Sequence, residues 1–156
     1  MYLLTLHAPY ISLLSMHAHT DYNLLNWGMA APSSLNSIHS KINKALRIMT
    51  FNNRDCPSVP LYKELKILTL EKSFELKNAK HMWKFHNGYL PHSLVSNFKV
   101  NSRNQITKSY SRLESLKRFS LFTAPFIWDK LPNPTKDKQT LKAFSESSKL
   151  HLLDNL

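Results

Sequence analysis

The sequence predicts a mostly α-helical fold, one domain of five or six helices with at most a short strand pair. Four segments place their apolar residues with the 3.6-residue period of an α-helix. The chain holds only two glycines, Gly28 and Gly88, and hairpin turns rely on glycine at positive φ. Its 156 residues suit a single domain with its own core.

Residues 1–21 form an apolar N-terminal segment, which we expect to be cut from a longer open reading frame. We expect helix within the first 26 residues, broken at Pro9. The apolar run is shorter than the roughly 20 residues of a membrane span and lacks the basic start of a signal peptide. A single cysteine, Cys56, excludes an intrachain disulfide. These features predict an intracellular protein with no membrane association.

The clearest helical pattern is SSLNSIHSKINKALRIMT, with Ser33 or Ser34 as the expected N-cap. Its apolar residues fall on one helical face, and its basic residues lie three apart on the other. The flanking stretches NWGMAAP and NNRDCPSVP are predicted loops because they are rich in Gly, Pro, Asn and Asp. LYKELKIL is predicted to be a short helix.

The stretch LEKSFELKNAKHMWKFHNGYLP predicts a helix with Thr69 as N-cap and Gly88 as its stop. At about 100° per residue, its apolar side chains spread over most of the circumference. Lys77, Lys80 and Lys84 fill the remaining sector of about 60°. We therefore expect a central helix that is covered on most sides and has one open edge, entirely basic.

Residues 99–118 carry six basic residues and one acid, and we expect a flexible linker. The following FSLF, 119–122, is the candidate strand. APFIWDKLPNP predicts a short helix with Pro125 at its first position and Pro132 ending it.

TLKAFSESSKLHLL predicts a last amphipathic helix with Leu141 and Phe144 facing inward. The chain therefore divides into the N-terminal segment, a helical region at 22–98, the basic linker and a C-terminal helical segment at 119–156.

The histidines do not form a convincing metal site. His17 and His19 are two residues apart, so on a helix they point about 200° apart, and no Cys, Asp or Glu cluster joins them or the nearby His7 and His39. We expect partly buried surface histidines and no bound metal or cofactor.

No arrangement of catalytic residues stands out either. Asp55, Glu64 and Lys66 form a D…ExK spacing, and Glu75 with Lys77 a second ExK, which some nucleases use on strands, where residues i and i+2 share a face. Both pairs lie in predicted helices, where they diverge. Cys56 has no histidine nearby to act as its base, and two glycines cannot build a phosphate-binding loop. The three tryptophans at 27, 83 and 128 are expected in the core.

The remaining signal is positive charge. The formal net charge is +11, and residues 41–149 hold all 21 basic residues against eight acids, a balance of 21 − 8 = +13. Such a density predicts a polyanionic partner, RNA or DNA, contacted at its phosphates. A solvated basic surface without a partner is the alternative. The predicted nucleic-acid-binding residues are Lys41, Lys44, Arg47, Lys77, Lys80, Lys84, Arg112, Lys117 and Arg118.

Four motifs in order resemble the tail of the reverse transcriptase of non-LTR retrotransposons of the jockey/CR1 type. They are YNLLNWGMA, INKALRIMTF, PLYKELKILTLEKSFELKNAKHMWKFHNGYLPHSL and PFIWDKLP. The resemblance runs from about Tyr22 to the end and is strongest over residues 60–95. Asp129 departs from the Asn usual in that family, and Ala124 from a frequent Gly.

The resemblance implies the thumb and post-thumb region of an RNA-directed DNA polymerase, in contact with template RNA and primed DNA. It also implies an upstream polymerase domain as a partner. The family's catalytic aspartates lie upstream in an F/Y-x-D-D motif, and this chain has no DD pair. We therefore expect no enzyme activity from the chain itself.

Two other functions fit the same residues. One is a stand-alone basic RNA- or DNA-binding module, such as a ribosome-associated protein. The other is a protein-interaction module that uses the apolar N-terminus.

Overall fold

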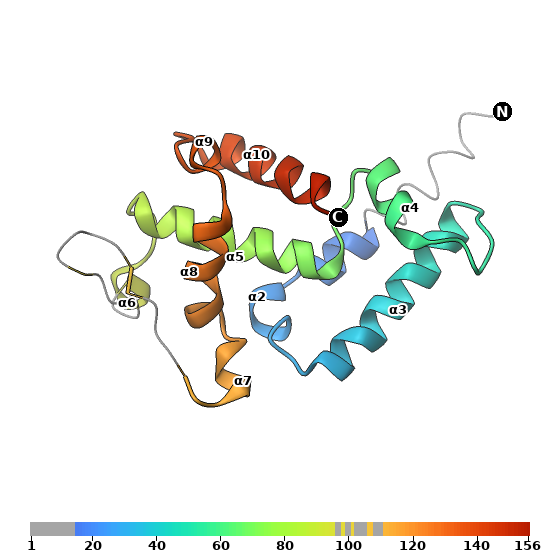
Figure 1. Cartoon of the computed structure of the whole chain (residues 1–156), viewed down its shortest axis with the longest axis horizontal. Coiled ribbons are helices and arrows are strands. Elements are labelled where there is room, and N and C mark those ends of the chain that lie inside the picture. Colours follow the sequence, from blue (N-terminus) through green and yellow to red (C-terminus); the bar gives the residue numbers. More distant parts are fainter. Residues whose placement is uncertain (1–14, 96–97, 99–100, 102–105, 108–110) are drawn as a thin grey trace.

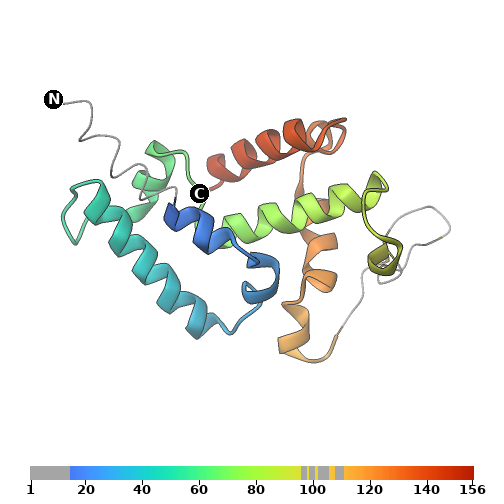
Figure 2. The same cartoon turned by 180° about the vertical axis from the view of Figure 1, so that it is seen from behind.

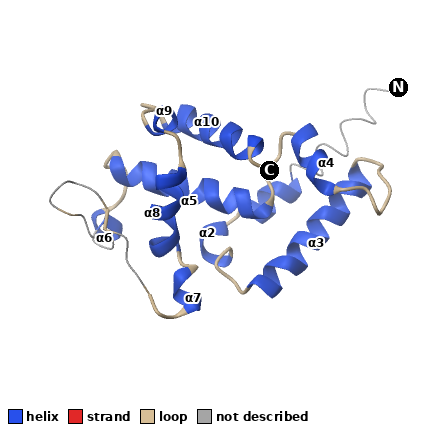
Figure 3. Ribbon diagram, in the orientation of Figure 1, coloured by secondary structure: helices blue, strands red, loops and turns tan. Residues whose placement is uncertain are grey.

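The structure is a computed structural model that describes residues 15–95, 98, 101, 106–107 and 111–156. Its regular elements are helices, and no β-strand occurs among these residues (Figure 3). The mostly α prediction is therefore confirmed. In chain order the helices are α2 Leu24–Trp27, α3 Pro32–Met49, α4 Ser58–Glu64, α5 Leu70–His86, α6 His92–Val95, α7 Glu114–Lys117, α8 Ser120–Lys130, α9 Asn133–Lys136 and α10 Leu141–Asp154.

The predicted number of five or six helices is wrong. The described residues hold nine helices from α2 to α10, and residues 15–21 are helical as well. Four of the nine, α2, α6, α7 and α9, are only four residues long. A single turn is too short to display a helical period, and its stability comes from packing onto neighbours.

Helix α5 is the centre of the fold, as predicted. Helices α2, α8 and α10 pack around it (Figures 1 and 2). Along α5, Ala79, Met82 and Trp83 are at most 2% exposed. Asn78 is also fully buried, which the apolar pattern did not predict, and its side chain donates a hydrogen bond to the Phe74 carbonyl.

Both predicted ends of α5 are confirmed. The Thr69 hydroxyl accepts a hydrogen bond from the backbone N–H of Lys72, so it caps the helix. At the other end Gly88 has a φ of 72°, a left-handed conformation that glycine adopts without strain. The Tyr89 N–H then donates to the Lys84 carbonyl at 2.8 Å, closing the helix in a Schellman motif.

Helix α8 corrects two predictions. It begins at Ser120, so the candidate strand at 119–122 lies mostly inside a helix, and Pro125 lies within the helix rather than at its first position. Proline in a helix interior costs about 3 kcal/mol. The buried Ala124 packs against Met82 of α5, and this packing offsets that cost. The predicted end is confirmed, because Leu131 before Pro132 is extended.

Helix α3 begins two or three residues earlier than predicted. Its first residue is Pro32, its N-cap is Ala31, and no side chain caps it, so the expected cap at Ser33 or Ser34 is wrong. Proline at the first position supplies a preset φ and has no N–H left to satisfy, which makes a side-chain cap less necessary. The short helix predicted at LYKELKIL is α4, which begins earlier, at Ser58.

Helices α3 and α4 build a second core beside α5. Leu46, Leu61 and Tyr62 are at most 4% exposed and form its centre. The Tyr62 hydroxyl donates to the Asn43 side chain at 2.8 Å, which satisfies its buried polar end. Burial raises the pKa of Tyr62 to about 12.

The last helix, α10, follows the prediction. The Thr140 hydroxyl accepts from the Ala143 N–H as its cap. Phe144 is fully buried against α5, and Leu141 is half-buried beside it. Much of the predicted linker, and most of the N-terminal segment with its predicted break at Pro9, lies outside the described residues. Within the linker, residues Glu114–Lys117 form the short helix α7.

Candidate nucleic-acid interface

The three lysines predicted as a strip on α5 do share one side of the helix, but that side is not an open edge. Lys77, Lys80 and Lys84 are each half-buried. The helical residues 15–21 cover the N-terminal part of the strip, and Asp21 from this segment pairs with Lys77. The expectation of an entirely basic, open edge is therefore wrong at Lys77. No local pattern in the sequence indicated which segment would lie there.

A hollow of about 280 Å³ opens beside this strip, and we call it the basic hollow. It is formed by residues 15–21, the turn between α4 and α5, α5 itself and α10. Its charged lining consists of four lysines and a single carboxylate. Its lining residues are His17, Asp21, Leu65, Lys66, Ile67, Leu68, Ser73, Leu76, Lys77, Lys80, Ser145 and Lys149.

Two of these lysines were not among the predicted binding residues. Lys66 stands just after α4 and has a φ of 53°, in the turn that leads back toward α5. Lys149 is on α10, about 70 to 80 residues away along the chain from the other lysines in the hollow. No local pattern links them, so only the packing of α10 and the α4–α5 turn around α5 could reveal this cluster.

Among the described residues that line the basic hollow, Asp21 is the only one with a carboxylate. One of its oxygens lies 3.4 Å from the ammonium nitrogen of Lys77. Its other oxygen, Oδ1, is buried and has no hydrogen-bond partner among the described residues. Buried polar atoms usually have at least one hydrogen-bond partner, so this oxygen is unsatisfied. The Asp21–Lys77 pair is about one-third exposed on each side, so it contributes little stability.

Burial and the excess of positive charge in the hollow lower the pKa values of two groups that line it. Burial lowers the pKa of Lys80, and the neighbouring Lys77 lowers it further, while Asp21 opposes both effects. Burial also lowers the pKa of His17, against the raising influence of Asp21. His17 is therefore largely neutral at pH 7. An added anion would relieve the repulsion among these groups.

The strip continues from the hollow to an exposed aromatic residue. Beyond Lys84, the ring of Tyr89 stacks on Trp83 with centroids 5.6 Å apart and planes 9° apart. Trp83 is 2% exposed and Tyr89 is 68% exposed, so the tyrosine presents its outer face to solvent. Together with Lys84 they line a shallow depression at the start of α10. Trp83 is core, as predicted, whereas Trp27 and Trp128 are only half-buried.

The predicted binding residues on α3 lie elsewhere. Lys41 and Lys44 are exposed, whereas Arg47 is half-buried and its Nε donates to the Cys56 carbonyl at 2.6 Å. Arg47 therefore holds the loop between α3 and α4 in place. None of the three lines the basic hollow.

The predicted residues near α7 are also separate from the hollow. Arg112 is exposed, Lys117 pairs with Glu114, and Arg118 donates to the Ala30 carbonyl at 3.3 Å. The Arg118 contact joins α7 to the loop before α3. The nine predicted residues thus fall on three surfaces, and the structure brings together only those on α5.

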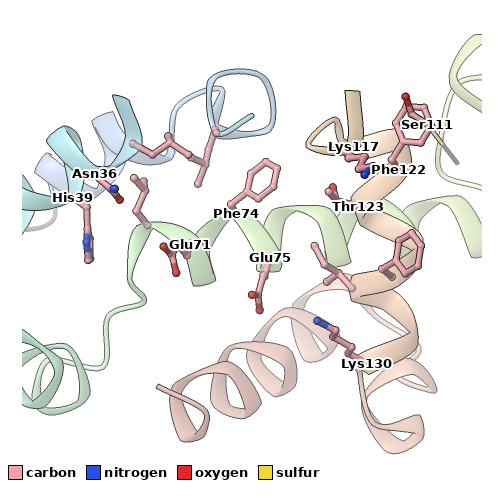
Figure 4. A pocket seen from close by; sticks show the side chains of 16 residues that line it. Asn36, His39, Glu71, Phe74, Glu75, Ser111, Lys117, Phe122, Thr123 and Lys130 are labelled. Carbon is pink, nitrogen blue, oxygen red and sulfur yellow. The ribbon is translucent and has the colours of Figure 1, made fainter. Parts of the chain in front are cut away.

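A second, larger concavity of about 560 Å³ crosses α5 on another side, and we call it the apolar groove (Figure 4). Phe74 of α5 points into it, with Phe122 of α8 on the opposite wall. Its charged residues balance, two glutamates against two lysines. They are Glu71, Glu75, Lys117 and Lys130. The balance leaves no excess of positive charge, so the apolar groove is not the surface that suits phosphates.

The residues considered for metal or nuclease chemistry stay apart. No group of three His, Cys, Asp or Glu side chains in the described part of the chain could hold a metal ion. Glu75 pairs with Lys72, while Lys77 pairs with Asp21, so the second nuclease-like pair diverges as expected on a helix. Cys56 is a free thiol in a half-buried loop position.

Across the described helices, none has the length and apolar character needed to cross a membrane. Comparison of the chain with protein-family models, curated proteins and solved structures found no match.

Proposed function

We propose that this chain binds RNA or DNA at the phosphate backbone, through the lysines gathered along α5. The observation that carries this proposal is the basic hollow. Lys66, Lys77, Lys80 and Lys149 come from three parts of the fold and meet with one carboxylate among them. Besides burial, the positive charges of Lys77 and Lys149 lower the pKa of Lys80, so these ammonium groups repel one another, and phosphate is an anion that lysine arrays bind.

The residues next to the hollow favour a nucleic acid as the ligand over a single small anion. Lys84 follows Lys80 by one helical turn, and the exposed ring of Tyr89 comes next. Proteins that bind single strands combine a basic track with aromatic rings on which bases stack. The hollow and Lys84 supply a basic track, and Tyr89 beside them supplies an aromatic ring.

We further propose that the chain is the non-catalytic C-terminal region of a retroelement reverse transcriptase. This rests on the four motifs in their order, which fall on α2, on part of α3, on α4 and α5, and on part of α8. An upstream polymerase domain is then its natural partner. Two-metal phosphoryl transfer needs paired carboxylates, and the chain has no DD pair, so we propose no polymerase activity for it. Purified protein should extend no primer.

Salt dependence tests the binding proposal. Replacing Lys77, Lys80 and Lys84 together with Gln should weaken binding to all sequences alike. On duplex DNA, the slope of log K against log salt should fall by up to about 0.9 for each phosphate that a lysine no longer neutralises.

A matched variant distinguishes the specific effect of the α5 lysines from the general effect of removing three positive charges. Lys63, Lys138 and Lys142 are exposed and line neither the hollow nor the Tyr89 depression, so their triple Gln variant removes the same three charges. Its slope should change little. If both triple variants behave alike, or if the α5 variant binds an RNA–DNA hybrid as tightly as the parent at all salt concentrations, the proposal fails. A double variant at Lys41 and Lys44 tests the α3 surface in the same way.

A further inference from the structure

The charge inside the basic hollow exceeds what one backbone phosphate requires. Four lysines and Asp21 give a formal balance of 4 − 1 = +3, with His17 neutral. A phosphodiester within a strand carries one negative charge. A terminal phosphomonoester carries about −1.5 to −2 at pH 7 and offers three acceptor oxygens. The hollow is therefore better matched to the end of a strand than to its interior.

Asp21 occupies this hollow in the way that an internal counter-ion would. Its Oδ2 meets the Lys77 ammonium at 3.4 Å, a long distance for a charge-assisted hydrogen bond. Its Oδ1 is buried and lacks a partner among the described residues. A carboxylate so weakly held is easily displaced by a group with more charge and more acceptors.

We infer that the basic hollow is a binding site for a terminal phosphate group, and that Asp21 occupies part of this site until the phosphate displaces it. The inference rests on the proposed function, and it adds a preferred feature of the ligand, a phosphorylated strand end. Lys149 of α10, Lys66 of the α4–α5 turn and Lys80 of α5 all line the hollow and together contact the phosphate. Lys84 and Tyr89 then receive the nucleotides that follow.

The test compares two single-stranded oligonucleotides of one sequence, with a 5′-phosphate or with a 5′-hydroxyl. The full chain should bind the phosphorylated strand about tenfold more tightly, since one charge-assisted hydrogen bond is worth about that ratio. Lys149→Gln should weaken binding of the phosphorylated strand more than binding of the hydroxyl strand, so that this preference is lost. Asp21→Asn should increase the preference, because it removes the competing carboxylate.

Lys142→Gln is the control for Lys149→Gln, because Lys142 is an exposed lysine on the same helix outside the hollow. It should keep the preference intact. Thermal unfolding of each variant shows whether the fold survives. Inorganic phosphate is titrated alone as well, to separate a strand end from free phosphate. Weaker binding of free phosphate than of the phosphorylated strand, together with a preference over the hydroxyl strand, identifies the strand end as the ligand.

The outcomes are distinct. Equal, salt-dependent binding of both strands would overturn the terminal-phosphate inference and leave nucleic-acid binding standing. A preference that persists in Lys149→Gln or falls in Asp21→Asn would overturn it as well. Free phosphate bound as tightly as the phosphorylated strand would assign the hollow to phosphate itself and overturn the assignment to strand ends. Failure of both strands to bind would reject the proposed function too.

Discussion

The indole nitrogen of Trp83 donates a hydrogen bond of 3.0 Å to the backbone carbonyl of Lys138, 55 residues further along the chain. This bond joins the central helix α5 to the segment that leads into α10. The same indole ring packs against Phe144 with centroids 6.0 Å apart, and Phe144 is fully buried. One side chain therefore fixes α10, the helix that carries Lys149, against the lysines of α5.

Replacing Trp83 with Ala should lower the free energy of unfolding by about 3–5 kcal/mol, the usual cost of removing a large buried aromatic side chain. Urea unfolding followed by circular dichroism measures the change. Trp83→Phe keeps an aromatic ring in the core but loses the bond to Lys138 and part of the packing, so it should cost less than Trp83→Ala. A loss below about 1 kcal/mol for the alanine variant would contradict the central place of Trp83 in the core.

Gly28→Ala should destabilise the protein, even though Gly28 has an ordinary helical φ of −64°. A β-carbon there would lie 2.5 Å from the Leu24 carbonyl oxygen and 2.6 Å from the Phe74 ring. Relieving such overlap by shifting backbone and ring costs about 1–3 kcal/mol.

The matched variant for this prediction is Gly28→Ala combined with Phe74→Leu, which removes the ring atoms in the way. The double variant should lose less free energy of unfolding than the sum of the losses in the two single variants. Strict additivity would show that the ring does not contribute to the clash.

Acid should weaken the fold through three histidines, of which His17 and His81 are half-buried and His86 is exposed. Burial is the main cause that lowers the pKa of His17, His81 and His86 below the ordinary value of 6.5. The unfolded chain therefore binds protons on these residues at a higher pH than the folded chain does. Unfolding is favoured by this difference as the pH falls through 6.5, and full stability is present above it.

Urea unfolding at a series of pH values between about 5 and 8 measures this dependence. His81→Gln should make the free energy of unfolding depend less steeply on pH below 6.5. A stability that rises on acidification over this range would contradict the assignment.

Tyr89→Ala should weaken binding of single strands more than binding of duplexes. The exposed face of Tyr89 is free for a base to stack on, and a base–aromatic stack is worth about 1–3 kcal/mol. Bases in a duplex are already stacked and cannot use the ring. Fluorescence anisotropy with a labelled single strand and its duplex measures both affinities.

Tyr89→Phe serves as the control because it keeps the aromatic face and should bind like the parent. An equal loss of affinity for single strand and duplex in Tyr89→Ala would point to a structural effect on Trp83 beneath it.

The central helix shows how much a local sequence can determine. Its start at Thr69 and its stop at Gly88 were both predicted, because a cap and a glycine stop act through hydrogen bonds within a few residues. The face that carries Lys77, Lys80 and Lys84 was also predicted, because the helical period alone sets it. The excess of positive charge after residue 40 needs no structure at all.

Contacts between distant segments decided the rest. Pro125 reads locally as a helix start, yet packing of Ala124 against α5 places it inside α8. Asp21 covers Lys77, and Lys149 joins Lys66, only because residues 15–21 and α10 pack on the same side of α5. The sequence determined which residues are charged and which face of a helix they share. Tertiary packing decided which charges meet, because that depends on contacts between residues far apart in the chain, for which no local pattern exists.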